Sequence, residues 1–326
     1  MKYIITGGAG FIGSALLWGL NERGVSDVLV VDDIDSDDKE INIAGLQYEQ
    51  LAGIKEFREK LVAGEYNDSG VEAVLHMGAC SSTTENDWDY LVDNNVEYSK
   101  DIIRWCFDRD GRCVYASSAA TYGDGKLGFK DDHDLFDRLK PLNLYGKSKL
   151  AVDIWARDGG YLDKVVGLRY FNVFGSNEQH KGSMRSVIAK KFEQVRDKGV
   201  IELFKSYNDG FGDGEQERDF VYIKDAVAAT LFFMDNPVLG GVFNVGSGVA
   251  RTWNDVARSM FAALDKEVKI NYIDMPAEVK NQYQYHTQAD ISKLRQAGYK
   301  GKFMSLEDAV ADYVRNYLVL GKRLEA

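Results

Sequence analysis

The chain has 326 residues, of which 45% are hydrophobic, so it can bury a substantial core and belongs to neither the disordered nor the fibrous class. Its longest apolar runs fall far short of the roughly 20 residues that a membrane-spanning helix needs, and we expect no membrane partner. The formal net charge of −11 at pH 7 disfavours nucleic acid and anionic membranes as partners. Any anionic ligand must therefore be held by local groups.

The cysteines and histidines, which in other proteins form disulfides or bind metals, are few and scattered here; they are Cys80, Cys106, Cys113, His76, His133, His180 and His286. The cysteines are odd in number and lack metal-ligand spacing, so we interpret them as reduced thiols. The histidines lack the paired spacing of a zinc site, and we expect no metal. The chain begins with the pattern of a strand rather than of a signal peptide. A cytoplasmic location is therefore expected.

Short apolar runs alternate with helical periodicity along the chain. The runs that we predict to be strands are Tyr3–Thr6, Val28–Asp32, Ala73–His76, Cys113–Ser117, Val165–Arg169 and Phe243–Val245. Helices are predicted over Phe11–Asn21 and Asn94–Asp108. This alternation predicts right-handed crossovers and an α/β fold built on a doubly wound parallel Rossmann sheet.

The chain carries no clear linker, and its division into domains follows from the order of the motifs. We predict a dinucleotide-binding Rossmann domain over residues 1–172 and a smaller, mainly substrate-binding domain over residues 173–326. Some segments after residue 172 are expected to return to the first domain. Two polar stretches, Asp32–Glu40 and Ser206–Glu217, are predicted to be loops, the second of them mobile.

A glycine-rich turn follows the first predicted strand. Gly7, Gly10 and Gly13 stand between that strand and the first helix, where backbone amides and the helix amino terminus can hold a pyrophosphate. Gly13 permits close packing of the helix on the strand. An acid, Asp32, ends the second strand, as dinucleotide-binding folds require. The chain is therefore predicted to bind a nicotinamide adenine dinucleotide.

The choice between NAD and NADP stays open at this point. Asp32 can accept hydrogen bonds from the adenosine ribose, which favours NAD and repels a 2′-phosphate. Lys39 lies a few residues further on and can neutralise such a phosphate. A solvated lysine among acids is an equally good interpretation of Lys39.

A tyrosine and a lysine stand four residues apart in Tyr145-Gly146-Lys147-Ser148-Lys149. In a helix both side chains lie on one face. A free tyrosine is a poor base at neutral pH, and an adjacent ammonium lowers its pKa by stabilising the phenolate. Ser118, at the carboxyl end of a predicted strand, is positioned to bridge to the reacting oxygen. We interpret Tyr145, Lys149 and Ser118 as a catalytic group.

Several motifs follow one another along this chain in the order that is typical of a known family. TGGAGFIGS from Thr6, YASSAATYG from Tyr115 and YGKSK from Tyr145 resemble the extended short-chain dehydrogenase/reductase superfamily. GACSSTTE from Gly78 and HKGSM from His180 are similar, more narrowly, to the ADP-L-glycero-D-manno-heptose 6-epimerases. The likeness is supported by RYFNV, RDFVY and TQAD segments and spans nearly the whole chain.

The resemblance implies an isomerase that inverts carbon six of an ADP-linked manno-heptose, in the supply of the inner-core heptose of lipopolysaccharide. The hydrogen on that carbon is not acidic, because no carbonyl neighbours it. Transient oxidation to a ketone by bound NADP, with hydride return to the opposite face, is therefore the natural route. The resemblance also implies a homo-oligomer, often a pentamer.

The same resemblance assigns one acid/base role to Tyr145 and a second to Lys181. From the residues alone, Lys181 would be an exposed or phosphate-contacting lysine. Cofactor contacts are implied for Gly7, Gly10, Phe11, Ile12, Gly13, Asp32, Asp33, Lys39, Met77, Gly78, Ala79, Cys80, Ser81, Asn94, Lys149 and Val173. Substrate contacts are implied for Ser118, Asn172, Ser183, Lys190, Phe204, Lys205, Ser206, Tyr207, Arg218 and Tyr283. Family members favour NADP, which supports Lys39 as a phosphate ligand.

At some positions more than one interpretation of the residues stays open. Arg218 can bind two oxygens of a diphosphate, but a structural ion pair with Asp219 or a neighbouring residue competes with that interpretation. The segment GSNE at Gly175–Glu178 lacks the Pro-Arg common in the family, and the Ser206–Glu217 loop is longer and more acidic than usual. Both departures concern sugar and diphosphate binding.

Three other functions compete with this prediction. Another sugar-nucleotide epimerase, such as a UDP-hexose 4-epimerase, shares most of these motifs. A dehydratase usually carries Asp-Glu beside its signature, where this chain has Ala119-Ala120 after Ser118. A non-catalytic dinucleotide sensor typically loses the tyrosine or the lysine, and both Tyr145 and Lys149 are present.

Overall fold

Seven short strands pair in parallel to form the central sheet, in the order β10-β6-β5-β4-β1-β2-β3. The computed structural model describes residues 1–280 and 283–326. The strands are β1 Tyr3–Thr6, β2 Val28–Val31, β3 Gln50–Ala52, β4 Ala73–His76, β5 Arg112–Ser118, β6 Val166–Tyr170 and β10 Gly241–Val245. Most of their side chains are fully buried, as parallel strands covered on both faces require. The predicted α/β fold with a doubly wound sheet is confirmed.

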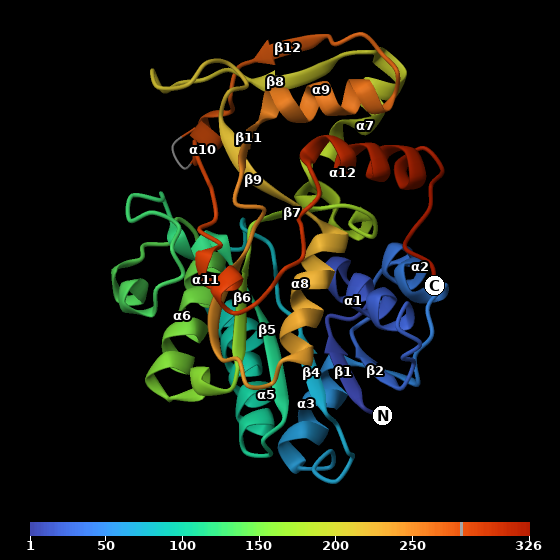
Figure 1. The fold of residues 1–326 in the computed structure, drawn as a ribbon, viewed down its shortest axis with the longest axis vertical. Helices are drawn as coiled ribbons and strands as arrows, with labels where there is room; N and C mark the ends of the chain where they lie inside the picture. Colours follow the sequence, from blue (N-terminus) through green and yellow to red (C-terminus); the bar gives the residue numbers. More distant parts are fainter. Residues whose placement is uncertain (281–282) are drawn as a thin grey trace.

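Helices cover both faces of this sheet (Figure 1). One face carries α1 packed on α8, and right-handed crossovers place α3, α5 and α6 on the other. Their bounds are α1 Phe11–Asn21, α2 Asp37–Ala44, α3 Ile54–Ala63, α4 Trp88–Leu91, α5 Tyr98–Phe107, α6 Leu144–Asp158 and α8 Ile223–Asp235. Short 3₁₀ segments connect them at η2 Ala119–Tyr122, η3 His133–Arg138 and η4 Tyr161–Asp163.

A second group of elements lies above the carboxyl ends of these strands, at the top of Figure 1. β7 Asn172–Phe174, β9 Glu217–Tyr222 and β11 Ala250–Thr252 form a three-stranded sheet, and β8 Ile201–Phe204 pairs with β12 Ile270–Ile273. The helical segments are η5 Gln179–Met184, α7 Val187–Lys198, α9 Trp253–Ala263, α10 Ala277–Lys280, α12 Leu306–Tyr313 and η6 Val314–Leu318. The short helix α11 Ser292–Gln296 instead contacts β10 of the central sheet. The boundary at residue 172 stays a prediction, although β10 is a later segment that joins the first sheet.

The register of the central sheet brings several predicted site residues to one edge. Thr6, at the end of β1, pairs with His76, at the end of β4, and His76 pairs with Tyr115 in β5. The chain order reverses between β1 and β4, which is where doubly wound sheets open a crevice for ligands. The glycine turn after β1 and the loop after β4 therefore face the same space.

Two predicted elements differ from the structure. Asp32–Glu40 was expected to be a loop throughout, but α2 begins at Asp37. Asp37 and Asp38 lie in its first turn, where carboxylates interact favourably with the helix dipole. The helix expected over Asn94–Asp108 begins as a π-helical segment, η1 Val92–Glu97, before α5.

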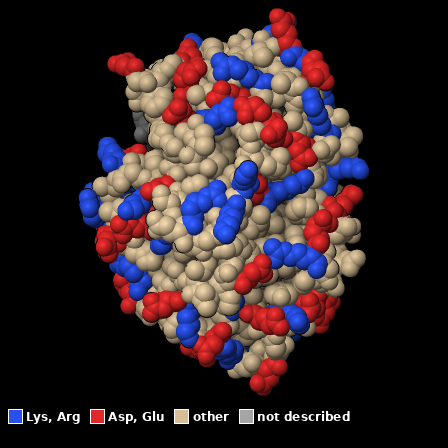
Figure 2. Space-filling model, in the orientation of Figure 1, with Lys and Arg blue, Asp and Glu red and all other residues tan. Residues whose placement is uncertain are grey.

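The surface carries charges of both signs. On the face drawn in Figure 2, acidic and basic residues are interspersed, with a group of blue side chains near the centre. Among the helices of residues 1–280 and 283–326, none has both the length and the apolar character that crossing a membrane requires.

Candidate active site

The turn between β1 and α1 is closed too tightly for side chains. Gly7 has a φ of 64°, and a Cβ at this position would lie 2.7 Å from the backbone nitrogen of Gly78. A Cβ on Gly13 would collide with the carbonyl oxygen of Gly7. Backbone amides at the start of α1 are thus left open to a ligand, and the turn fits the pyrophosphate of a dinucleotide.

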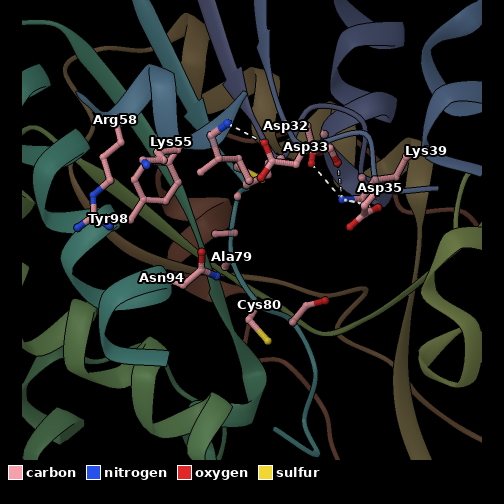
Figure 3. Close-up of a pocket in the computed structure, with 18 of the residues that line it drawn as sticks. Asp32, Asp33, Asp35, Lys39, Lys55, Arg58, Ala79, Cys80, Asn94 and Tyr98 are labelled. Atoms are coloured by element: carbon pink, nitrogen blue, oxygen red, sulfur yellow. Dashed lines mark hydrogen bonds and ion pairs between the residues drawn. The ribbon is translucent and has the colours of Figure 1, made fainter. Parts of the chain in front are cut away.

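A cavity of about 1400 Å³ begins at this turn. Fourteen of the residues predicted to contact the cofactor line it: Gly7, Gly10, Phe11, Ile12, Gly13, Asp32, Asp33, Lys39, Met77, Gly78, Ala79, Cys80, Ser81 and Asn94. Figure 3 shows Asp32, Asp33 and Lys39 grouped on one side of this cavity. The volume is ample for a dinucleotide, since ordinary small-molecule pockets measure about 300–1,000 Å³.

The acid at the end of β2 is already engaged. Oδ2 of Asp32 accepts a hydrogen bond from the backbone nitrogen of Ala9 at 3.0 Å, and Oδ1 accepts one from Lys39 Nζ at 3.1 Å. Burial raises the pKa of Asp32, while Lys39 and the backbone of Ala9 oppose that rise. Asp32 therefore holds the glycine turn and Lys39 in place, besides facing the adenosine side of the cavity.

A second cavity of about 410 Å³ adjoins the first, because Phe11, Ile12 and Lys181 line both. It opens at the carboxyl end of β5. The predicted residues on its wall are Ser118, Tyr145, Lys149, Asn172, Val173, Lys181 and Lys190. All four residues predicted to be catalytic thus face one space beside the dinucleotide cavity.

Helix α6 carries two of these residues on one face. It begins after Asn143, whose side chain caps the helix by accepting from the backbone nitrogen of Gly146 at 2.8 Å. Burial raises the pKa of Tyr145, and the Ser118 hydroxyl opposes this. The lowered tyrosine pKa that we expected from Lys149 is therefore wrong for this structure. Burial instead lowers the pKa of Lys149 to about 8, closer to neutral pH than the pKa of a free lysine.

The loop that carries Lys181 is held by a buried carboxylate. Glu178 accepts a hydrogen bond from the hydroxyl of Ser186 at 2.7 Å and another from the Ser186 backbone. Lys181 Nζ lies 5.2 Å from the centre of the Phe11 ring. Burial lowers the pKa of Lys181, which makes proton exchange near neutral pH easier.

Seven predicted substrate residues do not line either cavity: Ser183, Phe204, Lys205, Ser206, Tyr207, Arg218 and Tyr283. Arg218 is buried, and its guanidinium carbon lies 5.7 Å from the ring centre of Trp253, a residue that lines the second cavity. Within the described residues no ion pair joins Arg218 to Asp219, whose carboxylate instead accepts from Ser247, Gly248 and Ala289. Lys205 and Tyr207 both contact Asp274, near the two-stranded sheet.

Sequence comparison agrees with this geometry. Residues 3–246 match the NAD dependent epimerase/dehydratase family, which covers most of the chain, including the glycine turn, Tyr145 and Lys181. The chain belongs to this family. Dependence on a nicotinamide adenine dinucleotide, which the glycine turn predicts, is confirmed by this membership, whereas a preference for NADP stays a prediction.

Relatives within this epimerase/dehydratase family are similar over nearly their whole length. The ADP-L-glycero-D-manno-heptose-6-epimerase of Nitratidesulfovibrio vulgaris is 49% identical over 316 residues, covering 97% of this chain and 98% of the relative. The enzyme of the same name from Fusobacterium nucleatum subsp. nucleatum is 45% identical, with 97% of each chain covered. The predicted resemblance to these epimerases, and with it the prediction of an isomerase, is confirmed.

Solved structures of family members have the same fold. The ADP-L-glycero-D-manno-heptose-6-epimerase of Helicobacter pylori superposes with a TM-score of 0.79 at 27% identity, covering 97% of this chain and 95% of that one. A UDP-glucuronic acid 4-epimerase from Bacillus cereus, in complex with UDP-glucuronic acid and NAD, gives a TM-score of 0.76 at 23% identity, covering 97% and 99%. The second likeness shows the fold alone.

Some residues that line the large cavity were not predicted from the sequence. Lys55 and Arg58 line it from α3, on the side opposite Lys39 in Figure 3, and His180 lines it from η5. A signal for Lys55 was present, because it follows β3 and therefore stands at the carboxyl edge of the sheet. The short strand β3 was not predicted, so this signal went unused.

Proposed function

We propose that this enzyme inverts carbon six of an ADP-linked manno-heptose by transient oxidation and reduction with bound NADP, and so supplies the inner-core heptose of lipopolysaccharide. The proposal draws the substrate from the relatives that are 45–49% identical over nearly the whole chain. The observation that carries it is the second cavity, whose wall includes Tyr145 and Lys181 together. When the ketone turns over, its oxygen takes up a second position, and the two groups can serve one position each.

The chemistry explains what each of the two acid/base groups does. Bound nicotinamide supplies the removal of hydride from carbon six and its return. Tyr145 first passes its own proton to the amine form of Lys149. As tyrosinate it then receives the proton of the hydroxyl on that carbon, while Ser118 holds the oxygen. After the ketone has turned its other face to the cofactor, its oxygen points away from Tyr145. Lys181, from the separate loop η5, then supplies the proton.

The groups around the reacting oxygen are suited to these transfers. Lys149 is buried four residues after Tyr145, and burial lowers its pKa to about 8, so its amine form can accept the proton of Tyr145. Burial likewise lowers the pKa of Lys181. Lys190, on the same cavity wall, is a cation for the diphosphate.

The preference for NADP rests on Lys39, the cation beside Asp32 at the adenosine end of the large cavity. Without it, Asp32 and Asp33 would repel a 2′-phosphate.

Incubation of the purified protein with ADP-D-glycero-D-manno-heptose, followed by separation of the two epimers, tests the substrate. We expect the L-glycero epimer to accumulate until the two reach equilibrium. UDP-glucose serves as the comparison substrate, because a UDP-hexose 4-epimerase would convert it to its epimer. Conversion of UDP-glucose without conversion of the heptose would replace this proposal with that function.

A further inference from the structure

His180 occupies a place in the large cavity that the proposed reaction does not use. It lies beside Lys181 in η5, and its ring lines the cavity together with Gly10 and Phe11. Nδ1 of His180 lies 3.2 Å from Nδ2 of Asn42, which is 1% exposed. The opposite ring nitrogen, Nε2, would lie 4.0 Å from a Cβ placed on Gly10.

The orientation of the Asn42 amide is set by the end of the chain. Arg323 Nε donates to Asn42 Oδ1 at 3.2 Å, and a guanidinium has no atom that accepts a hydrogen bond. Nδ2 of Asn42 must therefore be the atom that faces the carbonyl oxygens of Ala9 and Asn177, both at 3.1 Å. The same nitrogen faces His180.

One tautomer of His180 follows when Nδ1 pairs with Asn42. An amide nitrogen donates and does not accept, so in this pair Nδ1 accepts and the ring proton resides on Nε2. The Asn177 carbonyl is the competing partner of Nδ1, because it keeps a free lone pair after accepting from Asn42. Burial lowers the pKa of His180 to about 4, and the charges of Lys39 and Lys181 act in the same direction. The ring is therefore neutral at pH 7 and presents a single donor.

That donor faces the amino terminus of α1. Gly10 is the residue before the first turn of this 11-residue helix, whose free backbone nitrogens bind phosphate oxygens in dinucleotide-binding folds. A neutral N–H completes such a site without adding charge beside Lys39 and Lys181.

We propose that His180 pairs through Nδ1 with Asn42 and donates a hydrogen bond from Nε2 to a pyrophosphate oxygen of the dinucleotide. The inference rests on dinucleotide binding and is independent of the sugar substrate. The same donor could meet the 2′-phosphate of NADP instead. The position of Nε2 next to Gly10 favours the pyrophosphate, which NAD and NADP share.

Calorimetric titration of nucleotide-free protein with NAD and with NADP tests this contact. His180→Phe keeps the ring volume and removes the donor, so both affinities should fall about tenfold, as loss of one hydrogen bond to a charged group implies. His180→Gln, which restores a donor at a similar distance, should recover most of the loss. His286→Phe is the matched control, because His286 pairs with Glu217 and lines neither cavity.

Three outcomes of these titrations overturn the inference. Unchanged binding in His180→Phe would show that Nε2 contacts no phosphate, and a loss confined to NADP would assign it to the 2′-phosphate. A wild-type protein that binds neither dinucleotide would remove the cofactor assignment as well, whereas failure of the heptose assay alone would leave the inference intact.

The tautomer has its own readout, independent of activity. Nitrogen-15 spectra of the four histidines should show a pyrrole-like Nε2 and a pyridine-like Nδ1 for His180, with the Nε2 signal shifting when NAD is added. A protonated Nδ1 would contradict the proposed geometry.

Discussion

Lys39 Nζ lies 3.1 Å from Oδ1 of Asp32, so the cation assigned to a 2′-phosphate is paired with the carboxylate that would repel one. The two side chains are 17% and 4% exposed, so solvent screens them weakly. The same ammonium donates to the carbonyl oxygen of Asp33 and lies 3.2 Å from Asp35 Oδ1. Lys39 thus neutralises Asp32 before any ligand arrives, and Asp35 competes for it.

Lys39→Ala should lower the affinity for NADP by about 10- to 100-fold, since a hydrogen bond to a charged group contributes about 1.5–3 kcal/mol. The affinity for NAD should change little, because NAD has no 2′-phosphate. Asp35→Asn should raise the affinity for NADP, because it removes an exposed carboxylate that competes for Lys39. Titration calorimetry with both cofactors measures these changes.

The double variant Lys39→Ala/Asp32→Asn is the control for the carboxylate left unpaired in Lys39→Ala. It should recover the part of the lost NADP affinity that is due to repulsion by Asp32. If Lys39→Ala lowered the affinities for NAD and NADP equally, Lys39 would not contact the 2′-phosphate.

The buried ion pair of Arg169 and Asp153 should dominate the stability of the strand–helix interface. Both side chains are fully buried, and Arg169 NH2 lies 2.9 Å from Asp153 Oδ2. Arg169→Leu leaves that carboxylate buried without its cation, and we expect it to lower the free energy of unfolding by about 3–5 kcal/mol. Urea unfolding followed by circular dichroism measures this.

Arg23→Leu is the matched control, because Arg23 pairs with Asp235 at 2.8 Å but both side chains are more than 40% exposed. Its effect should be about 0–1 kcal/mol. If both variants lost a similar amount of unfolding free energy, burial would not be the reason for the large effect expected of the Arg169–Asp153 pair.

His76 should make the protein less stable in acid. Its ring is buried between the hydroxyls of Thr6 and Ser99, and burial, helped by the charge of Lys149, lowers its pKa to about 3. An unfolded histidine titrates near 6.5, so between these values the unfolded state binds the extra proton and stability falls as the pH falls. His76→Gln should reduce the slope of unfolding free energy against pH by about 1.4 kcal/mol per unit between pH 6 and pH 4. If the unfolding free energies of variant and wild type changed with pH at the same slope, His76 would not be the group that destabilises the protein in acid.

The glycine turn and the catalytic tyrosine and lysine could be predicted because their signals are local. Gly7 to Gly13 directly follow β1, and Tyr145 and Lys149 are one helical turn apart. Patterns over a few residues suffice for such features. The seven strands of the central sheet were predicted except β3, which has only three residues, two of them exposed.

What could not be predicted depends on residues far apart in the chain. The pairing of His180 involves Asn42, 138 residues away, and the orientation of that amide depends on Arg323, which is 281 residues from Asn42. The pKa of Tyr145 depends on how deeply it is buried, which a motif does not state. Sequence reasoning likewise had no means of finding that Arg218 packs over the Trp253 ring and does not line the cavity.

Turnover of Lys181→Met on ADP-D-glycero-D-manno-heptose tests the two-base mechanism most directly, with Tyr145→Phe measured beside it. Both variants should retain bound dinucleotide, and in both kcat at saturating substrate should fall by about 100-fold or more, as loss of a general acid/base implies. If Lys181 only bound the diphosphate, its loss would raise KM and leave kcat unchanged. A Lys181→Met enzyme with wild-type kcat would therefore contradict the account and leave Tyr145 as the single acid/base.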